Sequence, residues 1–319
     1  MIRGWFFSLA LAVMAATGGA VAQAADGYNF MVPPWQRGQA IDDIRRLYRP
    51  MLDYLSARIG VPIVLVSAKT YEEAIDYLAS GRADFATMSP VPYIKAQTKT
   101  PGVHMLVTEL SWSADHHARR DSYAGMLVTL KSRSDINTLA DLKGKSLAFV
   151  SRDSSSGFVF PTAVLARSGI DYSTFFLKYD FLGSHPRVTD AVAAGSVDAG
   201  ATWDFNMEQA IAKHGDIFKV VSQVAIPNLG IAVHPNLPVE VQQKIKEALL
   251  AIDPALLEGL PTAGYVERPE SFYDIVRTVV EMNIHKRPRP VRSCGWLRLR
   301  SGAVSDSGCW RRLQRLRCC

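Results

Sequence analysis

The pattern of apolar and polar positions predicts alternating strands and helices along most of the chain. A helical stripe with spacings of three and four residues runs through Tyr71, Ala74, Ile75, Leu78 and Ala79. Gly81 follows this stripe and is typical of a helix end. The apolar runs Val61–Val66 before it and Ala83–Met88 after it indicate strands. This order predicts an α/β fold with a parallel sheet and helices on both of its faces.

A second unit of the same kind is predicted to begin near Tyr123. Its strands are expected at Met126–Leu130, Ser146–Val150 and Val197–Ala201, and its helices at Gly157–Ser168 and Val188–Ala194. The run from Ala79 to Ala86 is echoed by the run from Ala194 to Ala199. Both runs leave a helix through a glycine and enter a strand through an aspartate between apolar residues, which indicates two similar lobes.

We expect the chain to pass between these lobes twice. Residues 26–122 and 226–283 are assigned to the first lobe, and residues 123–225 to the second. The last helices, expected at 238–252 and 271–282, would pack on the first lobe. Two crossings make a hinge and place a cleft between the lobes.

Residues 1–25 have the pattern of a secretory signal peptide. Arg3 supplies a basic start, and residues 5–16 form an apolar run that is too short to span a bilayer comfortably. Small residues suited to cleavage follow near Ala22 to Ala25. No later run approaches the roughly 18 apolar residues of a membrane span. We therefore expect a soluble protein that is exported to the periplasm.

The basic charge and the cysteines are concentrated at the end of the chain. The 319 residues carry a net charge of +6 and include four cysteines. Residues 284–319 contain all four cysteines and a net charge of +9, so residues 1–283 carry −3. The overall charge is therefore no sign of nucleic-acid binding, and the cysteine spacing lacks the pattern of a zinc site. We interpret 284–319 as a disordered or out-of-frame extension, with a basic arm as the alternative.

The run Asp153-Ser154-Ser155-Ser156-Gly157-Phe158, between a predicted strand and a predicted helix, is the sharpest candidate for a binding site. Ser154, Ser155 and Ser156 bring three hydroxyls to a helix N-terminus, which carries a partial positive charge. Such a site suits a phosphate, phosphonate, sulfonate or carboxylate group. Ordinary capping by one serine is the structural alternative. The motif is neither a hydrolase nucleophile elbow nor a nucleotide phosphate loop.

Four further residues are candidates for the same site. Ser89 lies at another strand-to-helix junction, although helix capping is the simpler explanation for it. Tyr71 begins a helix, where a core position is the alternative, and His185 lies in a loop between a strand and a helix. Asp204 follows a strand at the sheet edge that faces the ligand crevice in open α/β sheets.

The order of these motifs resembles that of the phosphate/phosphite/phosphonate-binding proteins of bacterial ABC importers, a branch of the type II periplasmic binding proteins. The resemblance extends over about residues 28–283. The motifs that carry it are Tyr48-Arg49-Pro50-Met51-Leu52-Asp53-Tyr54-Leu55, Gly81-Arg82-Ala83-Asp84, Asp121-Ser122-Tyr123, Leu139-Ala140-Asp141-Leu142-Lys143-Gly144-Lys145, Ser154-Ser155-Ser156-Gly157-Phe158, Gly183-Ser184-His185, Gly195-Ser196-Val197-Asp198-Ala199-Gly200-Ala201 and Ile226-Pro227-Asn228.

The resemblance also implies which residues hold the ligand. By motif, the oxyanion would be bound by Tyr71, Tyr123, Ser154, Ser155, Ser156 and His185. Asp204 matches the acid that contacts the far end of aminoalkylphosphonates. Leu229 stands where some members have a second acid, which favours a smaller ligand such as phosphite, phosphate or methylphosphonate.

We therefore expect a periplasmic binding protein that closes on a small oxyanion and delivers it to the permease of an ABC importer. The prediction includes no catalytic residue, cofactor, metal or nucleic-acid partner. Two alternatives remain open from the sequence. One is a ligand-sensing module for a receptor kinase. The other is an enzyme of the same fold that uses Ser154–Ser156, His185 and Asp204.

Overall fold

The computed structural model describes residues 27–34, 40–113 and 117–285, with side chains through Met282. The predictions for the signal peptide and for residues 286–319 lie outside the described residues. The last helix, α9 (Asp274–His285), includes the first two residues of the predicted extension, which is expected to start at 284. Among the described residues, no helix is both long and apolar enough to cross a membrane.

The first lobe is built on a six-stranded sheet in the order β13-β4-β12-β3-β1-β2. Its strands are β1 (Tyr28–Val32), β2 (Ile63–Ser67), β3 (Phe85–Met88), β4 (His104–Glu109), β12 (Gly230–Val233) and β13 (Tyr265–Val266). Its helices are α1 (Ile41–Ile59), α2 (Tyr71–Ala79), α3 (Pro90–Lys99) and α8 (Val239–Leu250). Helix α2 packs on α3, whereas α1 packs on α8 and β2.

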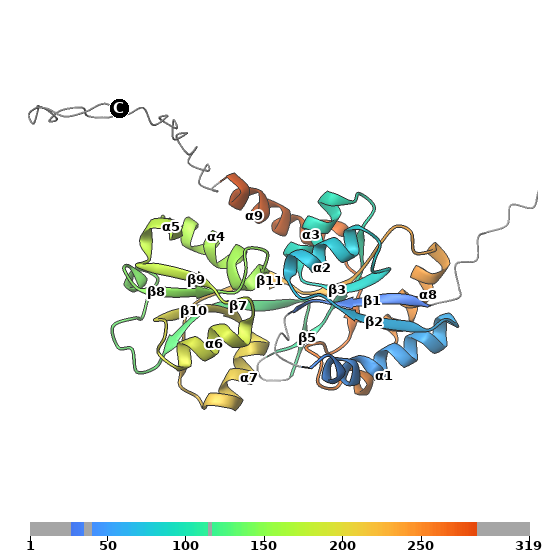
Figure 1. The fold of residues 1–319 in the computed structure, drawn as a ribbon, viewed down its shortest axis with the longest axis horizontal. Helices are drawn as coiled ribbons and strands as arrows, with labels where there is room; N and C mark the ends of the chain where they lie inside the picture. The colour runs from blue at the N-terminus through green and yellow to red at the C-terminus, as the bar shows by residue number, and fades with distance from the viewer. Residues whose placement is uncertain (1–26, 35–39, 114–116, 286–319) are drawn as a thin grey trace, which may run out of the picture. The chain divides into compact units, whose positions relative to one another are not determined.

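The second lobe is built on a five-stranded sheet in the order β11-β7-β10-β8-β9. Its strands are β7 (Ser122–Leu130), β8 (Ser146–Phe149), β9 (Lys178–Phe181), β10 (Ala199–Trp203) and β11 (Phe218–Pro227). Its helices are α4 (Phe160–Arg167), α5 (Tyr172–Phe175), α6 (His185–Ala193) and α7 (Asp204–His214). Figure 1 shows α4 and α5 over one face of this sheet and α6 and α7 over the other. The predicted lobe boundaries stay a prediction, close to where this sheet begins and ends.

The prediction of a parallel sheet is wrong for both lobes, because each sheet is mixed. Strand β1 pairs in parallel with β2 and β3, but β12 runs antiparallel between β3 and β4. In the second lobe β7 runs antiparallel to both β10 and β11. The reason is the path of the chain. A strand that arrives from the other lobe begins beside the hinge, where the parallel strands of its sheet end. It therefore runs antiparallel to those strands.

The predicted repeat is confirmed by an aspartate that holds the same position in each sheet. The Asp84 backbone N–H donates to the Asn29 carbonyl, and its carboxylate accepts from the Asn29 N–H at 2.7 Å. Asp198 makes the same two bonds with Ser146, again with 2.7 Å to the carboxylate. Each aspartate therefore joins the start of its strand to the start of a neighbouring parallel strand, which is β1 in the first lobe and β8 in the second.

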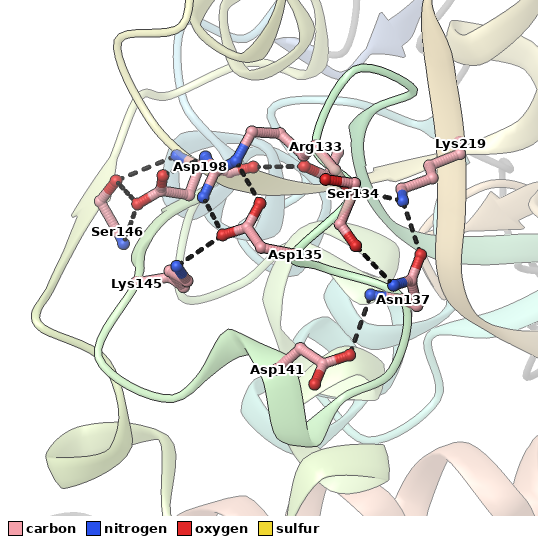
Figure 2. A network of polar contacts seen from close by, with 10 residues as sticks. Arg133, Ser134, Asp135, Asn137, Asp141, Lys145, Ser146, Asp198 and Lys219 are labelled. Carbon is pink, nitrogen blue, oxygen red and sulfur yellow. Dashed lines mark hydrogen bonds and ion pairs between the residues drawn. The ribbon is translucent and has the colours of Figure 1, made fainter.

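Asp198 belongs to a wider polar network in the second lobe (Figure 2). Arg133 forms ion pairs with Asp198 and Asp135, and Lys145 pairs with Asp135 at 2.7 Å. The network joins the connection between β7 and β8 to the starts of β8 and β10. It lies at the opposite ends of these strands from the residues described next, so we assign it a structural role.

The two sheets are joined by two segments, as predicted, and α9 adds a third link. The first segment, after β4, contains a small hairpin of β5 (Ser111–Trp112) and β6 (Arg119–Arg120), and the second joins β11 to β12. Helix α9 packs against α3 of the first lobe and α4 of the second (Figure 1). Helix α9 thus contacts the first lobe, as expected for the last helices, and also contacts the second lobe.

Candidate functional site

Seven of the eight predicted site residues line one small cavity of about 20 Å³ between the two sheets. They are Tyr71, Ser89, Tyr123, Ser154, Ser155, Ser156 and His185. Trp203 and Leu229 complete the lining. A cavity of this size holds about one water molecule, so a tetrahedral oxyanion would require its walls to move apart slightly.

The serine loop enters this cavity through an unusual helix start. Residues Ser155–Val159 form a π-helical turn before α4, so the helix starts two residues before the predicted Gly157. Single π turns are frequent at functional sites. The Ser154 hydroxyl accepts from the Gly157 N–H at 3.0 Å, so the capping alternative is correct for this serine. A Cβ at Gly157 would lie 2.4 Å from Val150, so only glycine fits there.

Helix α3 of the first lobe directs its N-terminus at the same loop. Pro90 and Pro92 lack an N–H, so Val91 supplies the N–H that the first turn can donate. This N–H donates to the Ser155 hydroxyl at 3.0 Å across the two lobes. The N-cap residue Ser89 makes no side-chain capping bond, and its hydroxyl is buried without a hydrogen-bond partner. The capping explanation is therefore wrong for the Ser89 hydroxyl, which lines the cavity.

Two buried tyrosines add neutral donors from opposite sides. Tyr71 is hydrogen-bonded to Ser154, and burial raises the pKa of Tyr71 to about 12. Tyr123 is hydrogen-bonded to Ser156 and Ser155, and burial raises its pKa further. Both phenols therefore keep their protons at neutral pH and can donate to an anion. Tyr71 occupies a core position as well, so its structural and site interpretations both hold.

His185 is a neutral member of the lining. It begins α6, it is 3% exposed, and burial lowers its pKa to about 3. Its Nδ1 atom lies 3.3 Å from the Thr202 hydroxyl. Its ring also lies 6.0 Å from that of Trp203. Among the residues that the structure describes, no lysine or arginine lines the cavity, so a bound anion would meet hydroxyls, a neutral ring and a helix end there.

Asp204 lies apart from the other predicted residues. Its carboxylate accepts from the Ala124 N–H at 2.9 Å, and burial is the largest effect on its pKa, which is raised. It lines a different cavity of about 530 Å³, together with Trp112, Phe205 and Glu208. Trp203 lines both cavities and so forms a wall between them.

Three elements of the small cavity were absent from the sequence prediction: Trp203, Leu229 as a lining residue, and the Val91 N–H. Trp203 ends a strand at the same sheet edge as Asp204, and this position was the available signal for it. The Val91 donor depends on how the two lobes meet, which no local pattern reveals. In the described ranges, no cluster of three or more His, Cys, Asp or Glu side chains is placed to hold a metal ion.

The chain matches a protein-family model and several known proteins. The family model described as ABC transporter, phosphonate, periplasmic substrate-binding protein matches residues 35–273. The phosphate-import protein PhnD of Mycolicibacterium smegmatis is 27% identical over 181 residues, which are 55% of each chain. The chain thus spans about half the length of this curated relative.

Two solved structures have the same fold. PhnD1 of Prochlorococcus marinus, in complex with methylphosphonate, has a TM-score of 0.69 at 17% identity, over 80% of this chain and 98% of that one. A binding protein component of an ABC phosphonate transporter from Pseudomonas aeruginosa has a TM-score of 0.69 at 18% identity. The match covers 81% of this chain and 87% of that one. The family consists of substrate-binding transporter components rather than enzymes. This chain belongs to the family of periplasmic substrate-binding proteins of phosphonate ABC transporters.

Proposed function

We propose that this protein captures a phosphorus oxyanion in the cavity lined by Ser154, Ser155, Ser156, Tyr71, Tyr123, Ser89 and His185. The ligand would be a phosphonate, phosphite or phosphate. It would be bound by hydroxyls of both lobes and by the N-terminus of α3, and the lobes would close around it. Closure then depends on how much more tightly the ligand binds the closed form than the open form.

The observation that carries the proposal is the unpartnered hydroxyl of Ser89. A buried hydroxyl without a partner is costly, and native proteins seldom keep one without a reason. This one lines the same cavity as the three serines of the opposite lobe. An oxyanion between them would accept from Ser89 and from the Ser155 hydroxyl, which now accepts from Val91.

The lining favours a small substituent on the phosphorus atom. Leu229 is apolar and 4% exposed, and no carboxylate of the described part of the chain lines the cavity to receive an ammonium group. Asp204 lies beyond the Trp203 wall, bonded to the backbone. Phosphate import by the Mycolicibacterium relative and the methylphosphonate in the Prochlorococcus structure agree with this preference.

We further propose that the loaded protein docks on the permease of an ABC importer. The description of the family as an ABC transporter component favours this role over the receptor-kinase sensor that the sequence left open. Residues 1–25 would act as the export signal. Mass spectrometry of the secreted protein should place its first residue between Ala22 and Asp26. An intact Met1 on exported protein would contradict the signal.

A thermal-shift panel on the full chain tests the ligand. The compounds are phosphate, phosphite, methylphosphonate, aminoethylphosphonate, sulfate and an alkanesulfonate. A ligand present at 100 times its Kd adds about 2.7 kcal/mol to the free energy of unfolding, which raises the melting temperature. We expect one of the three small phosphorus compounds to give the largest shift. The proposal fails if no phosphorus oxyanion moves the melting temperature.

A matched pair of variants locates the site. Ser155→Ala combined with Tyr123→Phe removes two lining hydroxyls and should abolish the ligand-induced shift while the protein still melts cooperatively. Ser222→Ala on β11 lines neither cavity and should keep the full shift. An unchanged ligand shift in the double variant would show that the ligand binds elsewhere.

A further inference from the structure

A buried polar network behind His185 decides which ring nitrogen of this histidine carries a proton. The network contains Thr189 on α6, Thr202 on β10 and Asn206 on α7. Thr202 is fully buried, Thr189 is 2% exposed and Asn206 is 3% exposed. None of the three lines the small cavity. Since solvent does not reach these groups, each of their hydrogens needs an acceptor within the protein.

The first step fixes the side-chain amide of Asn206. The Thr189 hydroxyl donates to a backbone carbonyl of its own helix, with the Pro186 oxygen at 3.1 Å and the His185 oxygen at 3.3 Å. Because the Thr189 hydrogen is donated to a carbonyl, the Thr189 oxygen can only accept a hydrogen bond from Asn206. The amide of Asn206 therefore turns its NH₂ group, and not its oxygen, toward Thr189 at 3.3 Å.

The second step fixes the hydroxyl of Thr202. The other hydrogen of the Asn206 NH₂ group is donated to the Thr202 oxygen at 2.9 Å. The remaining neighbour of this hydroxyl is His185 Nδ1, at 3.3 Å. If Nδ1 carried a proton, the Thr202 hydrogen would have no acceptor. If Nδ1 is unprotonated, it accepts the Thr202 hydrogen, and every hydrogen in the network then has an acceptor.

We infer that Thr202 and Asn206 are positioning residues that hold neutral His185 with its proton on Nε2, so that the ring donates to an oxyanion. Thr202 contacts Nδ1, so Nε2 is the ring nitrogen that remains for the ligand. The His185 ring lines the same cavity as the serine and tyrosine hydroxyls. The opposite tautomer would present a lone pair to the anion and repel it. This inference rests on the proposed binding of an oxyanion at His185.

Imidazole NMR of the full chain labelled with ¹⁵N-histidine tests the inference without any ligand. Long-range ¹H–¹⁵N correlations distinguish a protonated from an unprotonated ring nitrogen, and His185→Gln identifies the signal. We expect a protonated Nε2 and a bare Nδ1 in the wild type. Thr202→Val removes the donor, and Asn206→Asp replaces the NH₂ donor by an acceptor. Both variants should give a mixed or reversed tautomer.

The same variants should lose affinity for the best ligand of the thermal-shift panel. Calorimetry should show a roughly ten- to hundredfold weaker Kd, the effect of losing one hydrogen bond to a charged group. Thr202→Ser keeps the hydroxyl and should restore both the tautomer and the affinity. Thr129→Val is a matched control on β7, because this buried hydroxyl donates to the Asp198 carbonyl and not to a histidine.

A wild-type proton on Nδ1 would overturn the inference. So would Thr202→Val with an unchanged tautomer and wild-type affinity. If the wild type binds no oxyanion at all, the proposed function fails, but the NMR result on the free protein still decides the tautomer. Circular dichroism shows whether Thr202→Val folds. If it does not fold, Asn206→Asp and Thr202→Ser provide the test instead.

Discussion

Ser89 and Ser154 occupy similar places at the starts of helices, but their hydroxyls are engaged differently. Ser154 caps its helix through the Gly157 N–H, whereas the Ser89 hydroxyl is buried without a partner. A serine that caps a helix contributes to folding in every state of the protein. A serine without a partner contributes little to folding and is available to a ligand. Stability and binding should therefore separate at these two positions.

Ser89→Ala should weaken ligand binding by about tenfold or more, and it should leave the free energy of unfolding of the ligand-free protein unchanged or raise it, because it removes a buried hydroxyl without a partner. Ser154→Ala should lower that free energy by about 1 kcal/mol and weaken binding as well. Urea unfolding and titration calorimetry measure the two effects. Wild-type affinity in Ser89→Ala would contradict the role of this hydroxyl.

The residues of the small cavity were largely predictable, because they belong to local motifs. Ser154, Ser155 and Ser156 adjoin one another, and Ser89, Tyr71 and His185 each lie at a helix start. Asp204 shows the limit of this reasoning. It lies at the expected sheet edge, but its carboxylate is bonded to the Ala124 N–H of the neighbouring strand, a contact that depends on how β7 and β10 pair.

The π-helical turn at Ser155–Val159 is the element that brings the serine loop to the cavity. It packs against the end of β8, where the side chain of Val150 leaves no room for a Cβ atom at Gly157. The Val150 N–H also donates to the Gly157 carbonyl at 3.1 Å. The loop can therefore keep its course only while position 157 is glycine.

Gly157→Ala should lower the free energy of unfolding by roughly 1–3 kcal/mol, because its Cβ would lie 2.4 Å from Val150. It should also weaken ligand binding, since the three serines would shift. Val150→Ala in the same chain provides room and should recover part of both losses. Denaturant unfolding of the single and double variants gives the coupling between the two positions. Additive effects would show that the contact is not the cause.

The elements missed by the sequence pattern are those whose form depends on distant partners. Strand β9 is expected before His185 but without bounds, because it is an edge strand whose residues are exposed or half-buried and lack a clear apolar alternation. Helix α7 buries only Asn206, Met207 and Ala210, too few for a helical stripe. The antiparallel position of β12 follows from the route through the hinge, which a local pattern does not encode.

The two lobes are in contact across the cavity through charged as well as neutral groups. Lys95 on α3 forms an ion pair with Asp153 in the serine loop, and both side chains are about three-quarters buried. The Val91–Ser155 hydrogen bond lies beside it. Both contacts must break when the lobes separate, so they favour the closed arrangement.

Asp153→Asn should shift the protein toward the open form and weaken ligand binding by less than about tenfold, as expected for a partly exposed ion pair. Small-angle X-ray scattering of the ligand-free protein should show a larger radius of gyration. Asp76→Asn is the matched control, because Asp76 pairs with Lys99 inside the first lobe. An equal change in both variants would indicate a general charge effect.

Glu109, at the end of β4 where the chain leaves the first sheet, links the stability of the whole protein to pH. Its carboxylate is 4% exposed and accepts from the Thr87 hydroxyl at 2.7 Å. Burial raises the pKa of Glu109 from 4.5 to about 7. Since the folded state holds this proton more tightly, the contribution of Glu109 is fully present below about pH 4.5 and is lost as the pH rises through 7.

Glu109→Gln should remove this dependence. Relative to the variant, the wild type should lose up to about 3 kcal/mol of unfolding free energy between pH 4.5 and pH 8. Urea unfolding at several pH values measures the difference. Glu281→Gln changes an exposed glutamate on α9 and should leave the profile as it is. A constant difference between wild type and Glu109→Gln would rule out the raised pKa.

Within the described ranges, no lysine or arginine lines the small cavity, and this has a consequence for the proposed function. When an anion leaves, no unpaired cation remains buried, and the hydroxyls of Ser154, Ser155 and Ser156 pair with Tyr71 and Tyr123 instead. Under the proposed function, the ligand-free protein would therefore keep nearly the shape of the loaded one, with the Ser89 hydroxyl left without a partner. If the proposed permease recognised shape alone, it would respond to empty as well as to loaded protein. The lifetime of the closed form, rather than its geometry, would then distinguish the two.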